Sequence, residues 1–464
     1  MRTLVSTLCL ALPLAAQSAC EDLSQLDGLM QYSLVNLQVP GLSLQVTKAG
    51  ATRFEKTYGS YTLDTVVSIA SGSKWLSSAL LLVLVDEGKV QLDDKVSLYL
   101  PGFTGAKNSI TLRQCLAHTS GLPLDDAALA NPASTLGECA SVIASKPLAY
   151  NPGSTFAYGE CGMQIAGRVA EVVGGKSWAT LFAQKLATPL GMTRTDYAGL
   201  GVTTNPRIGA GARSTLREYG TFLRMLLNGG MHGPTRVLKA ASVQEMFKDQ
   251  IGTAVLLSQP FPTPRRYGLG CWRDRWSTNG TAHQVSSPGI FGFSPWIDLE
   301  RGMTGVFLVQ DSMLHVFPTV DGLQAVIRDL ITPIGVTCYG LWTTACAGPI
   351  VLNALAVPRR ASPDFGLLCH GVPPNTPGVI VLAAQQDVTG LLVEGIKLHL
   401  SLAGPILPLG VLSDPIGESW VTLAIPGSAV LGSKLYTQFL WNKPVSCQRQ
   451  GLLAASNALA ITIQ

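Results

Sequence analysis

The sequence predicts an α/β (α+β) domain, in which an antiparallel sheet is flanked by helices and joined by a helical region, followed by a small all-β sandwich. Three observations favour this fold class. An apolar, strand-like run at residues 66–70 leads directly into a strongly helical one. Helical patterns then alternate with strand candidates up to about residue 340. Beyond that point, short strand-like runs lie between Gly and Pro turns, as in an antiparallel sandwich.

The first junction carries the motif Ser71-Gly72-Ser73-Lys74. Residues i and i+3 share one face of a helix, so the Lys74 amine can reach the Ser71 hydroxyl and take its proton. The helix N-terminus adds N–H groups and a positive dipole end, which favour an oxyanion above Ser71. Ser71 could instead be a plain N-cap and Lys74 a solvated helix lysine. The ordered motifs that follow favour a nucleophilic serine.

The elements after this motif come in a fixed order. The patterns predict helices at 75–85, from 110, at 162–173, at 177–186 and at 216–227, and strands at 295–298 and 304–309. The second helix ends in the turn His118-Thr119-Ser120-Gly121-Leu122, and Tyr158 stands shortly before the third. The triplet Ser287-Pro288-Gly289 precedes the first of the two strands. His118 is predicted to be a buried structural hydrogen-bonding residue and not a base.

This series of motifs resembles the serine β-lactamase and penicillin-binding-protein superfamily, in the class C β-lactamase-related branch that includes the family VIII carboxylesterases. The resemblance covers about residues 23–331, and its most specific part is Ser-x-x-Lys together with His-Thr-Ser-Gly-Leu. It implies the β-lactamase/transpeptidase-like fold and acyl transfer through a serine.

The resemblance also implies roles for individual residues. Ser71 matches the nucleophile that becomes acylated, and Lys74 matches its partner amine. Tyr158 matches a tyrosine that acts with the lysine as general base and then returns a proton to the leaving group; neighbouring cations permit this by stabilising phenolate. The N–H groups of Ser71 and of Ile290, just after Gly289, match the two oxyanion donors. The alternative for Tyr158 is a core aromatic residue with a satisfied hydroxyl.

Two departures from the family pattern bear on the substrate. Glu160 stands where the family has Asn, and Ser287-Pro288-Gly289 stands where it has Lys-Thr-Gly or His-x-Gly. A carboxylate beside Lys74 would favour the charged amine and shift the role of base to Tyr158, unless Glu160 points into solvent. Without the Lys or His of that family triplet, the site lacks a cation that could pair with a carboxylate, so it is less suited to substrates that carry one. Residues that could replace that charge are Arg273, Arg275 and His283.

These features predict an exported serine hydrolase that cleaves carboxylic esters, or less readily amides, through an acyl-enzyme on Ser71. The alternatives among enzymes are a β-lactamase, a D-alanyl carboxypeptidase or aminopeptidase-like enzyme, and an enzyme that transfers the acyl group to an alcohol. A different class of protein would be a binding or scaffold module with a decayed site, but the intact Ser71, Lys74 and Tyr158 argue against decay.

The expected partner is a small-molecule ester or amide. No cofactor is predicted, and no metal site, because the histidines show no metal-ligand spacing. Charged residues make up 13% of the chain, the net charge is +4 and no basic block occurs, so no nucleic-acid partner is predicted. The sequence leaves the oligomeric state open.

The N-terminus has the pattern of an export signal at residues 1–19, with Arg2 as the positive end, an apolar stretch at 8–16 and small residues at the cleavage site. The mature protein is therefore expected to be secreted, periplasmic or at the cell surface. A lipid anchor at Cys20 is disfavoured, because Gln17 stands where a bacterial lipoprotein signal usually has Leu. The apolar run after Lys74 stops short of the roughly 20 residues that span a bilayer, so no transmembrane segment is predicted.

The expected domains are the hydrolase at 20–335, a linker at 336–363 and the sandwich at 364–464, since 464 residues are natural for two or three domains. No chemistry is assigned to the sandwich. Its clearest strand candidates are 379–383, 396–402, 420–425, 435–441 and 458–463.

The chain has ten cysteines, and removal of Cys9 with the signal leaves an odd number in an oxidising compartment. Closeness in sequence predicts the disulfides Cys139–Cys161 and Cys338–Cys346. Cys115 is predicted to be a buried, apolar free thiol.

Overall fold

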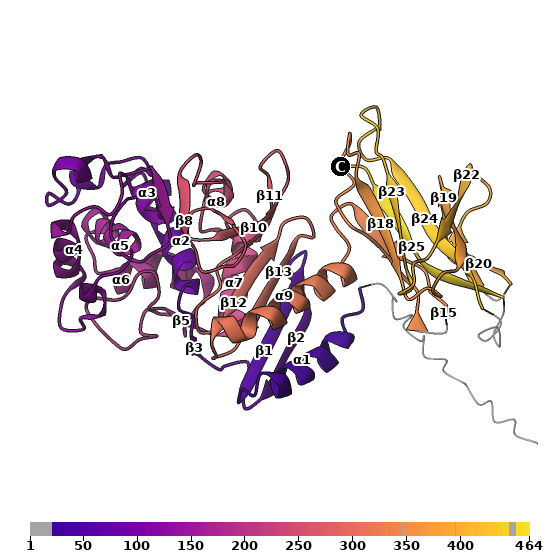
Figure 1. The fold of residues 1–464 in the computed structure, drawn as a ribbon, viewed down its shortest axis with the longest axis horizontal. Helices are drawn as coiled ribbons and strands as arrows, with labels where there is room; N and C mark the ends of the chain where they lie inside the picture. Colours follow the sequence, from indigo (N-terminus) through magenta and orange to yellow (C-terminus); the bar gives the residue numbers. More distant parts are fainter. Residues whose placement is uncertain (1–20, 346–347, 395, 445–451) are drawn as a thin grey trace, which may run out of the picture. The chain divides into compact units, whose positions relative to one another are not determined.

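The computed structural model describes residues 21–345, 348–394, 396–444 and 452–464. The chain divides into two compact units, whose elements are labelled in Figure 1. The first unit is Leu23–Ile327, and the second begins at Arg328 and includes Glu21 and Asp22. The division falls within helix α9 (Met313–Leu330).

An antiparallel sheet forms the centre of the first unit. Its order is β2 (Ala51–Gly59), β1 (Gly41–Lys48), β13 (Met303–Leu308), β12 (Ser294–Asp298), β11 (Ala282–Ser286), β10 (Trp272–Trp276) and β9 (Arg266–Tyr267). Every residue of β12 and β13 is buried, so both faces of these strands are covered. Helix α7 (Leu216–Leu227) packs against one face, and α1 (Gln25–Asn36) and α9 lie across the other (Figure 1).

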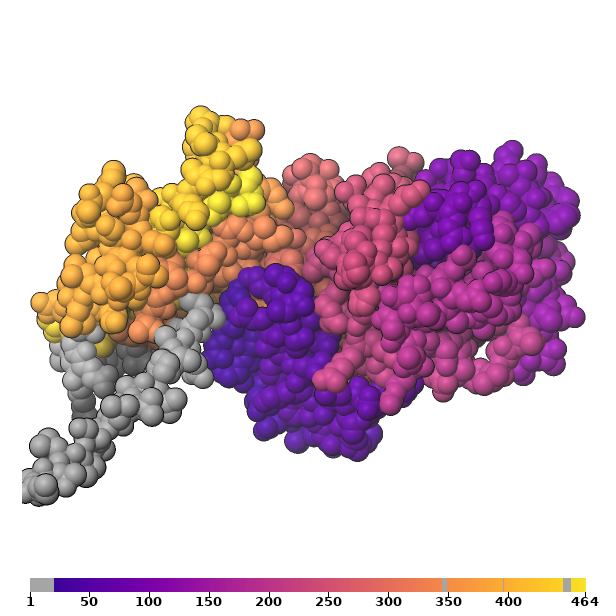
Figure 2. Space-filling model, turned by 180° about the vertical axis from the view of Figure 1, so that it is seen from behind, coloured from indigo at the N-terminus to yellow at the C-terminus, as the bar shows by residue number. Residues whose placement is uncertain are grey.

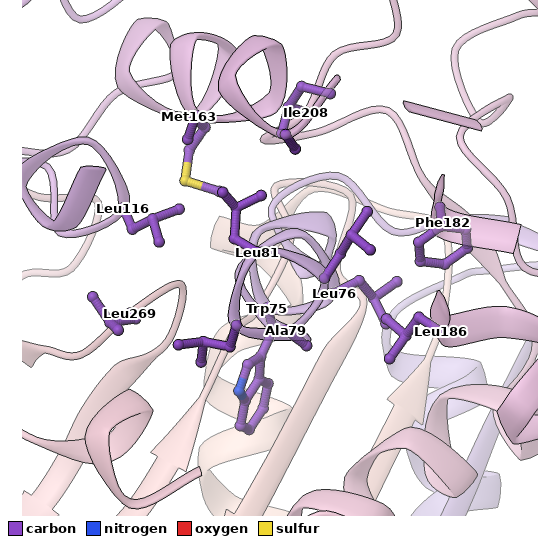
Figure 3. Packing of buried hydrophobic residues seen from close by; sticks show 14 of the residues in the cluster. Trp75, Leu76, Ala79, Leu81, Leu116, Met163, Phe182, Leu186, Ile208 and Leu269 are labelled. Atoms are coloured by element: carbon purple, nitrogen blue, oxygen red, sulfur yellow. The ribbon is translucent and has the colours of Figure 1, made fainter. Parts of the chain in front are cut away.

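The helical region is built around α2 (Gly72–Asp86), in which every residue from Gly72 to Leu84 is buried. A helix that is apolar on all sides needs neighbours all round. Figure 3 shows Trp75, Leu76 and Leu81 of α2 enclosed by side chains of other segments, among them Met163 and Phe182. The helices of this region are α3 (Leu112–Leu116), α4 (Leu136–Ser145), α5 (Cys161–Gly174), α6 (Trp178–Phe182) and α8 (Ala240–Phe247).

Short strand pairs join distant segments of the first unit. They are β3 (Val67–Ser68) with β5 (Arg213–Ser214), β4 (Thr155–Ala157) with β8 (Val255–Ser258), and β6 (Met231–His232) with β7 (Thr235–Arg236). From behind, the N-terminal segment lies beside the segment that contains α7 (Figure 2). An ion pair connects them there, since Arg217 Nε lies 3.0 Å from Glu55 Oε1.

The second unit contains two antiparallel sheets around a shared apolar core that includes Leu367, Phe439 and Trp441. One sheet has the order β14 (Val336–Tyr339), β25 (Leu453–Thr462), β24 (Lys434–Asn442), β19 (Pro377–Ala383) and β22 (Ile406–Leu412). The other consists of β17 (Val351–Ala354), β18 (Phe365–His370) and β23 (Glu418–Leu423). Two smaller pairs are β15 (Thr344–Ala345) with β16 (Gly348–Pro349), and β20 (Gln386–Val393) with β21 (Ile396–Leu400).

The predicted fold class is confirmed: an antiparallel sheet with helices and a helical region precedes a β-rich unit. One segment differs from the expectation. Residues expected to be a linker, 336–363, contribute β14 and β17 to the second unit, because β14 pairs with the last strand of the chain, β25. Residues 336–363 thus form short strands despite their Pro- and Gly-rich composition, because a partner strand supplies the hydrogen bonds.

The predicted disulfide between Cys139 and Cys161 is wrong, because both are buried free thiols. Both thiols are buried, Cys139 on α4 and Cys161 at the start of α5, and closeness in sequence does not by itself give the geometry of a disulfide. Burial raises the pKa of the Cys161 thiol to about 12. Cys115 is a buried free thiol, as predicted. Cys338 is not among the free thiols, and Cys346 lies outside the described residues, so that pairing stays a prediction.

Within the described ranges, no helix is long and apolar enough to cross a membrane. The predicted export signal at 1–19 and the possible anchor at Cys20 lie outside those ranges.

Candidate active site

Ser71 stands at the N-terminus of α2, just after the short strand β3. The main chain before it is fixed by the bond from Ile69 N–H to Ala212 O, at 3.0 Å, and Ala70 takes a left-handed φ of 43°. Ser71 occupies the N-cap position, but its side chain makes no capping hydrogen bond. The hydroxyl is therefore not used to cap the helix.

Lys74 is fully buried and lies against this hydroxyl. Its Nζ donates to Ser71 Oγ at 3.1 Å and to Gly209 O at 3.0 Å. The same Nζ lies 4.7 Å from the centre of the Tyr158 ring. The structure thus places Tyr158, which is distant in sequence, beside the Ser71–Lys74 pair of α2.

The Tyr158 ring is held in an aromatic setting. The ring centres of His118 and Trp272 lie 4.6 and 4.9 Å from the centre of the Tyr158 ring. The main-chain N–H of Tyr158 donates to Ser258 O at 3.1 Å. Strand β4, paired with β8, brings this residue to the site.

His118 is buried beneath Tyr158. Its Nδ1 faces the Gly159 N–H at 3.5 Å, and its Nε2 lies 3.2 Å from Tyr267 Oη. Burial first, and then the charge of Lys74, hold the pKa of His118 well below its usual value. A neutral ring that accepts a hydrogen bond at Nδ1 carries its own hydrogen on Nε2. His118 therefore connects Tyr267, on its Nε2 side, to the main chain next to Tyr158, on its Nδ1 side. This is the place of a structural hydrogen-bonding residue.

The two expected oxyanion donors belong to two segments, the start of α2 and the turn after β11. A Cβ on Gly289 would stand 2.2 Å from Ile69 O, so only glycine lets this turn approach the loop before Ser71. Gly289 N–H donates to Phe293 O at 2.8 Å, and Ile290 O accepts from Met313 N–H at 2.8 Å. No main-chain acceptor in the described part of the chain takes the N–H of Ser71 or Ile290.

Ser287, expected at the substrate, is instead turned into the protein. It is 2% exposed, and its Oγ lies 3.0 Å from Ser71 O and 3.1 Å from Gly270 O. The hydroxyl therefore ties the end of β11 to the main chain of the nucleophile.

Glu160 forms an ion pair with Arg207, a partner that no sequence motif indicates. Arg207 Nε donates to Glu160 Oε2 at 2.9 Å, and Arg207 Nη2 donates to the same oxygen. The Glu160 side chain is 19% exposed and the Arg207 side chain is 27% exposed, so the pair lies at the edge of the site and not in bulk solvent. Gly209, whose carbonyl holds Lys74, follows Arg207 by two residues.

The segment around Gly209 reaches close to both charged groups. A Cβ at this position would stand 3.3 Å from Lys74 Nζ and 3.6 Å from Glu160 Cγ. No motif marks Arg207 or Gly209, because their roles arise from proximity across 47 and 135 residues. The only local signal is the Asn-Pro and Gly-x-Gly composition of 205–211, which indicates an irregular loop.

Two of the cations considered as replacements are engaged elsewhere. Arg273 is 1% exposed and donates to Gly280 O, and burial lowers the pKa of this guanidinium from its usual value. His283 Nδ1 lies 3.5 Å from Glu300 Oε2. Arg275 extends from β10, opposite Gln284. Among the described residues, no group of three or more His, Cys, Asp and Glu side chains could hold a metal ion.

Comparison with known proteins gives concordant matches. A family model described as Beta-lactamase matches residues 25–325. The structure of a putative beta-lactamase from Bacteroides dorei DSM 17855 is 34% identical and superposes with a TM-score of 0.61 over 66% of this chain and 99% of its own. The structure of a family VIII carboxylesterase is 19% identical, with a TM-score of 0.53 over 64% of this chain and 96% of its own.

A curated relative, protein flp of Staphylococcus aureus (strain N315), is 29% identical over 188 residues, which are 37% of this chain and 38% of the relative. The chain thus spans well under half the length of that relative. The match to the family model covers well over half of the present chain and includes Ser71, Lys74, Tyr158 and Ile290. The chain therefore belongs to the β-lactamase family of serine hydrolases.

Proposed function

We propose that this protein hydrolyses carboxylic esters through an acyl-enzyme on Ser71. The observation that carries the proposal is the 3.1 Å contact between Ser71 Oγ and the buried Lys74 Nζ beneath the Tyr158 ring. A serine hydroxyl is a weak nucleophile unless a base stands within hydrogen-bond reach, and here an amine does. The N–H groups of Ser71 and Ile290 supply the oxyanion donors.

The reaction has two halves. Ser71 Oγ attacks the ester carbonyl carbon while its proton passes to the Lys74 and Tyr158 pair, and the carbonyl oxygen becomes the oxyanion held by the two N–H groups. The bond from carbon to the alcohol oxygen then breaks, and Tyr158 returns the proton to that oxygen. A water molecule, activated beside Tyr158, attacks the acyl carbon and gives up a proton to the same pair. The bond from this carbon to Ser71 Oγ then breaks, the pair returns the proton to Oγ, and the acid is released.

The charges around the site favour esters without a carboxylate. Arg207 is neutralised by Glu160, and Arg273 is buried in its own contacts. A free carboxylate on the substrate would therefore find neither Arg207 nor Arg273 available to pair with it, whereas the family pattern supplies a cation from its third motif. For the same reason, β-lactam and D-alanyl peptide turnover are expected to be weaker than ester turnover.

Export is part of the proposal. The pattern of residues 1–19 supports a cleaved signal and a mature protein that is secreted, periplasmic or at the cell surface. The mature chain would then consist of the hydrolase domain and a C-terminal β domain without chemistry of its own, which includes β14 and β17 from residues 336–363. An intact-mass measurement on the exported protein would test the cleavage site.

The test of the catalytic proposal compares the mature protein with Ser71→Ala. Hydrolysis of short-chain p-nitrophenyl esters should fall by at least 1,000-fold in the variant, on the order of the loss of a nucleophile. Brief exposure to a slow substrate should add one acyl mass, located at Ser71. The matched control is Ser141→Ala, an exposed serine of α4, which should behave as the parent protein.

The same preparation separates the other functions. Nitrocefin or D-Ala-D-Ala turnover above ester turnover would support the β-lactamase or peptidase alternatives, and new esters formed with added alcohols would support acyl transfer. No turnover and no labelling by a fluorophosphonate would reject an active serine in favour of a binding module.

A further inference from the structure

The segment at residues 205–209 belongs to no helix or strand of the described structure, yet it carries two groups of the site. Arg207 pairs with Glu160, and Gly209 O accepts from Lys74 Nζ at 3.0 Å. A buried segment without a hydrogen-bonded ladder of its own keeps its place only if other groups bind its main chain. The side chains that bind residues 205–209 therefore also place the carbonyl that meets Lys74.

Gln164, one turn into α5, binds this segment at three points. The residue is 1% exposed. Its Oε1 accepts the Ile208 N–H at 3.0 Å, and its Nε2 donates to Asn205 Oδ1 at 2.8 Å and to Pro206 O at 3.1 Å. One buried amide thus contacts the segment at three residues, the last of which directly precedes the glycine whose carbonyl meets the lysine amine.

Ser77 of α2 binds the same segment from a second helix. It lies three residues after Lys74, so the two side chains share one face of α2. Ser77 is 1% exposed, and its Oγ donates to Ile208 O at 2.7 Å. Buried side chains thus bind both main-chain groups of Ile208, its N–H through Gln164 and its carbonyl through Ser77. The next carbonyl along the chain is Gly209 O.

A buried, fully paired amide contributes to stability wherever it lies. Gln164 does more, because its contact with Ile208 lies one residue from the carbonyl that fixes the direction of the Lys74 amine. That amine must stay within hydrogen-bond reach of Ser71 Oγ, now 3.1 Å away, to take its proton. Building on the proposed function, we propose that Gln164 is a positioning residue for Lys74. It keeps the Gly209 carbonyl in contact with the amine, and the amine in reach of the nucleophile.

The test compares Gln164→Leu with the parent protein on p-nitrophenyl butyrate. Leucine is similar in size but makes none of the three hydrogen bonds, so the segment is released and the Lys74 amine loses its fixed acceptor. The value of kcat should fall by at least about 10-fold and up to about 100-fold, the cost of a misplacement of about 1 Å. KM should stay within about twofold, because both halves of the reaction use the same amine and slow together.

Labelling of Ser71 by a fluorophosphonate separates positioning from loss of fold. A less activated serine reacts with a smaller rate constant to the same final fraction, whereas a partly misfolded sample reacts to a smaller fraction at the parent rate constant. Gln164→Leu should show the first behaviour. The matched control is Gln438→Leu in β24, a buried amide that also accepts one main-chain N–H and donates to two carbonyl groups. It should keep the parent kcat.

A milder variant releases the same segment from the side of α2. Ser77→Ala removes the hydroxyl that binds Ile208 O and also meets Tyr197 Oη, and kcat should fall about fivefold, the factor for one lost hydrogen bond. The matched control is Ser78→Ala, because the buried Ser78 Oγ has no hydrogen-bond partner among the described residues. In the double variant of Gln164→Leu and Ser77→Ala, the loss should be smaller than the product of the single losses, because both release one segment.

The outcomes separate this inference from the proposed function. Parent values of kcat and of the labelling rate constant in Gln164→Leu, or losses that multiply in the double variant, would overturn the positioning role while leaving the hydrolase in place. If Gln164→Leu gives no folded protein, a parent value of kcat in Ser77→Ala overturns it. Absence of turnover and of label on Ser71 in the parent protein would reject the proposed function and the positioning role together.

Discussion

At the scale of single residues, the Glu160–Arg207 pair sets the charge next to Lys74. From the sequence, the Glu160 carboxylate is expected to act on Lys74, but in the structure this carboxylate has a guanidinium partner. The two charges of an ion pair largely cancel in their electrostatic effect on a nearby group, whereas either partner alone acts as a full charge. Whether Glu160 acts on Lys74 thus depends on Arg207, and this can be tested by removing the two charges separately.

Single neutral variants of the pair should shift the pH profile of ester turnover in opposite directions. Glu160→Gln leaves a cation that disfavours charged Lys74, so the acid limb of kcat/KM should move to lower pH. Arg207→Gln leaves an anion, so that limb should move to higher pH. The double variant should return close to the parent profile. Shifts in the same direction, or a double variant as displaced as either single one, would show that the pair acts through structure and not through charge.

At the scale of elements, the oxyanion turn after β11 approaches the loop between β3 and α2. Two features hold them together: the Ser287 hydroxyl between Ser71 O and Gly270 O, and the absence of a side chain on Gly289. The approach of these two main-chain segments supports the proposal that the Ile290 N–H serves as an oxyanion donor beside Ser71. A side-chain atom added between these two segments should therefore lower the catalytic rate more than it lowers the stability of the fold.

Gly289→Ala should lower kcat for p-nitrophenyl esters by about 100-fold, comparable to the loss of one oxyanion donor. Its Cβ would stand 2.2 Å from Ile69 O, so the turn must move away from Ser71. The matched control is Gly322→Ala in α9, where a Cβ meets nothing within 4 Å and helix propensity should add up to about 1 kcal/mol of stability. Steady-state kinetics and thermal unfolding measure both effects. Unchanged kcat in Gly289→Ala would contradict the assignment of Ile290 as a donor.

At the scale of the whole molecule, each unit contains a buried histidine that is neutral. In the second unit, His399 Nε2 accepts the Leu341 N–H at 3.0 Å, and Nδ1 lies 3.3 Å from Asp387 O. Burial lowers the pKa of His399 and of His118 from the usual value. The neighbouring charges of Asp387 and Lys397 act on His399 in opposite directions.

Both units should therefore lose stability as the pH falls below about 6.5, the usual histidine pKa, because the unfolded chain then binds protons that the folded chain does not. Each histidine contributes up to about 1.4 kcal/mol per pH unit between its unfolded and folded pKa values. Urea unfolding of the full chain at pH 7.5, 6.5 and 5.5 measures the slope. His399→Gln should flatten it for the second unit, and an unchanged slope would remove His399 as its cause.

The sequence by itself determined the local features of this protein. Hydrophobic periodicity and glycine stops marked helices such as α2, α5 and α7 and strands such as β12 and β13, because these signals depend on neighbours within a few residues. The spacing of Ser71 and Lys74 likewise determined their contact, since both lie on one turn of α2. Motif order was enough to indicate the family and the expected place of Tyr158.

Tertiary structure alone decided which side chains meet across the fold. The Ser287 hydroxyl points into the protein, and Glu160 forms an ion pair with Arg207. Cys139 and Cys161 are free thiols, and β14 of the expected linker pairs with β25. The three contacts among these join residues separated by 47 to 216 positions, and no local pattern records such distances. The physical reason is that a contact energy belongs to a pair of groups in space, whereas a sequence pattern reports only what each segment favours by itself.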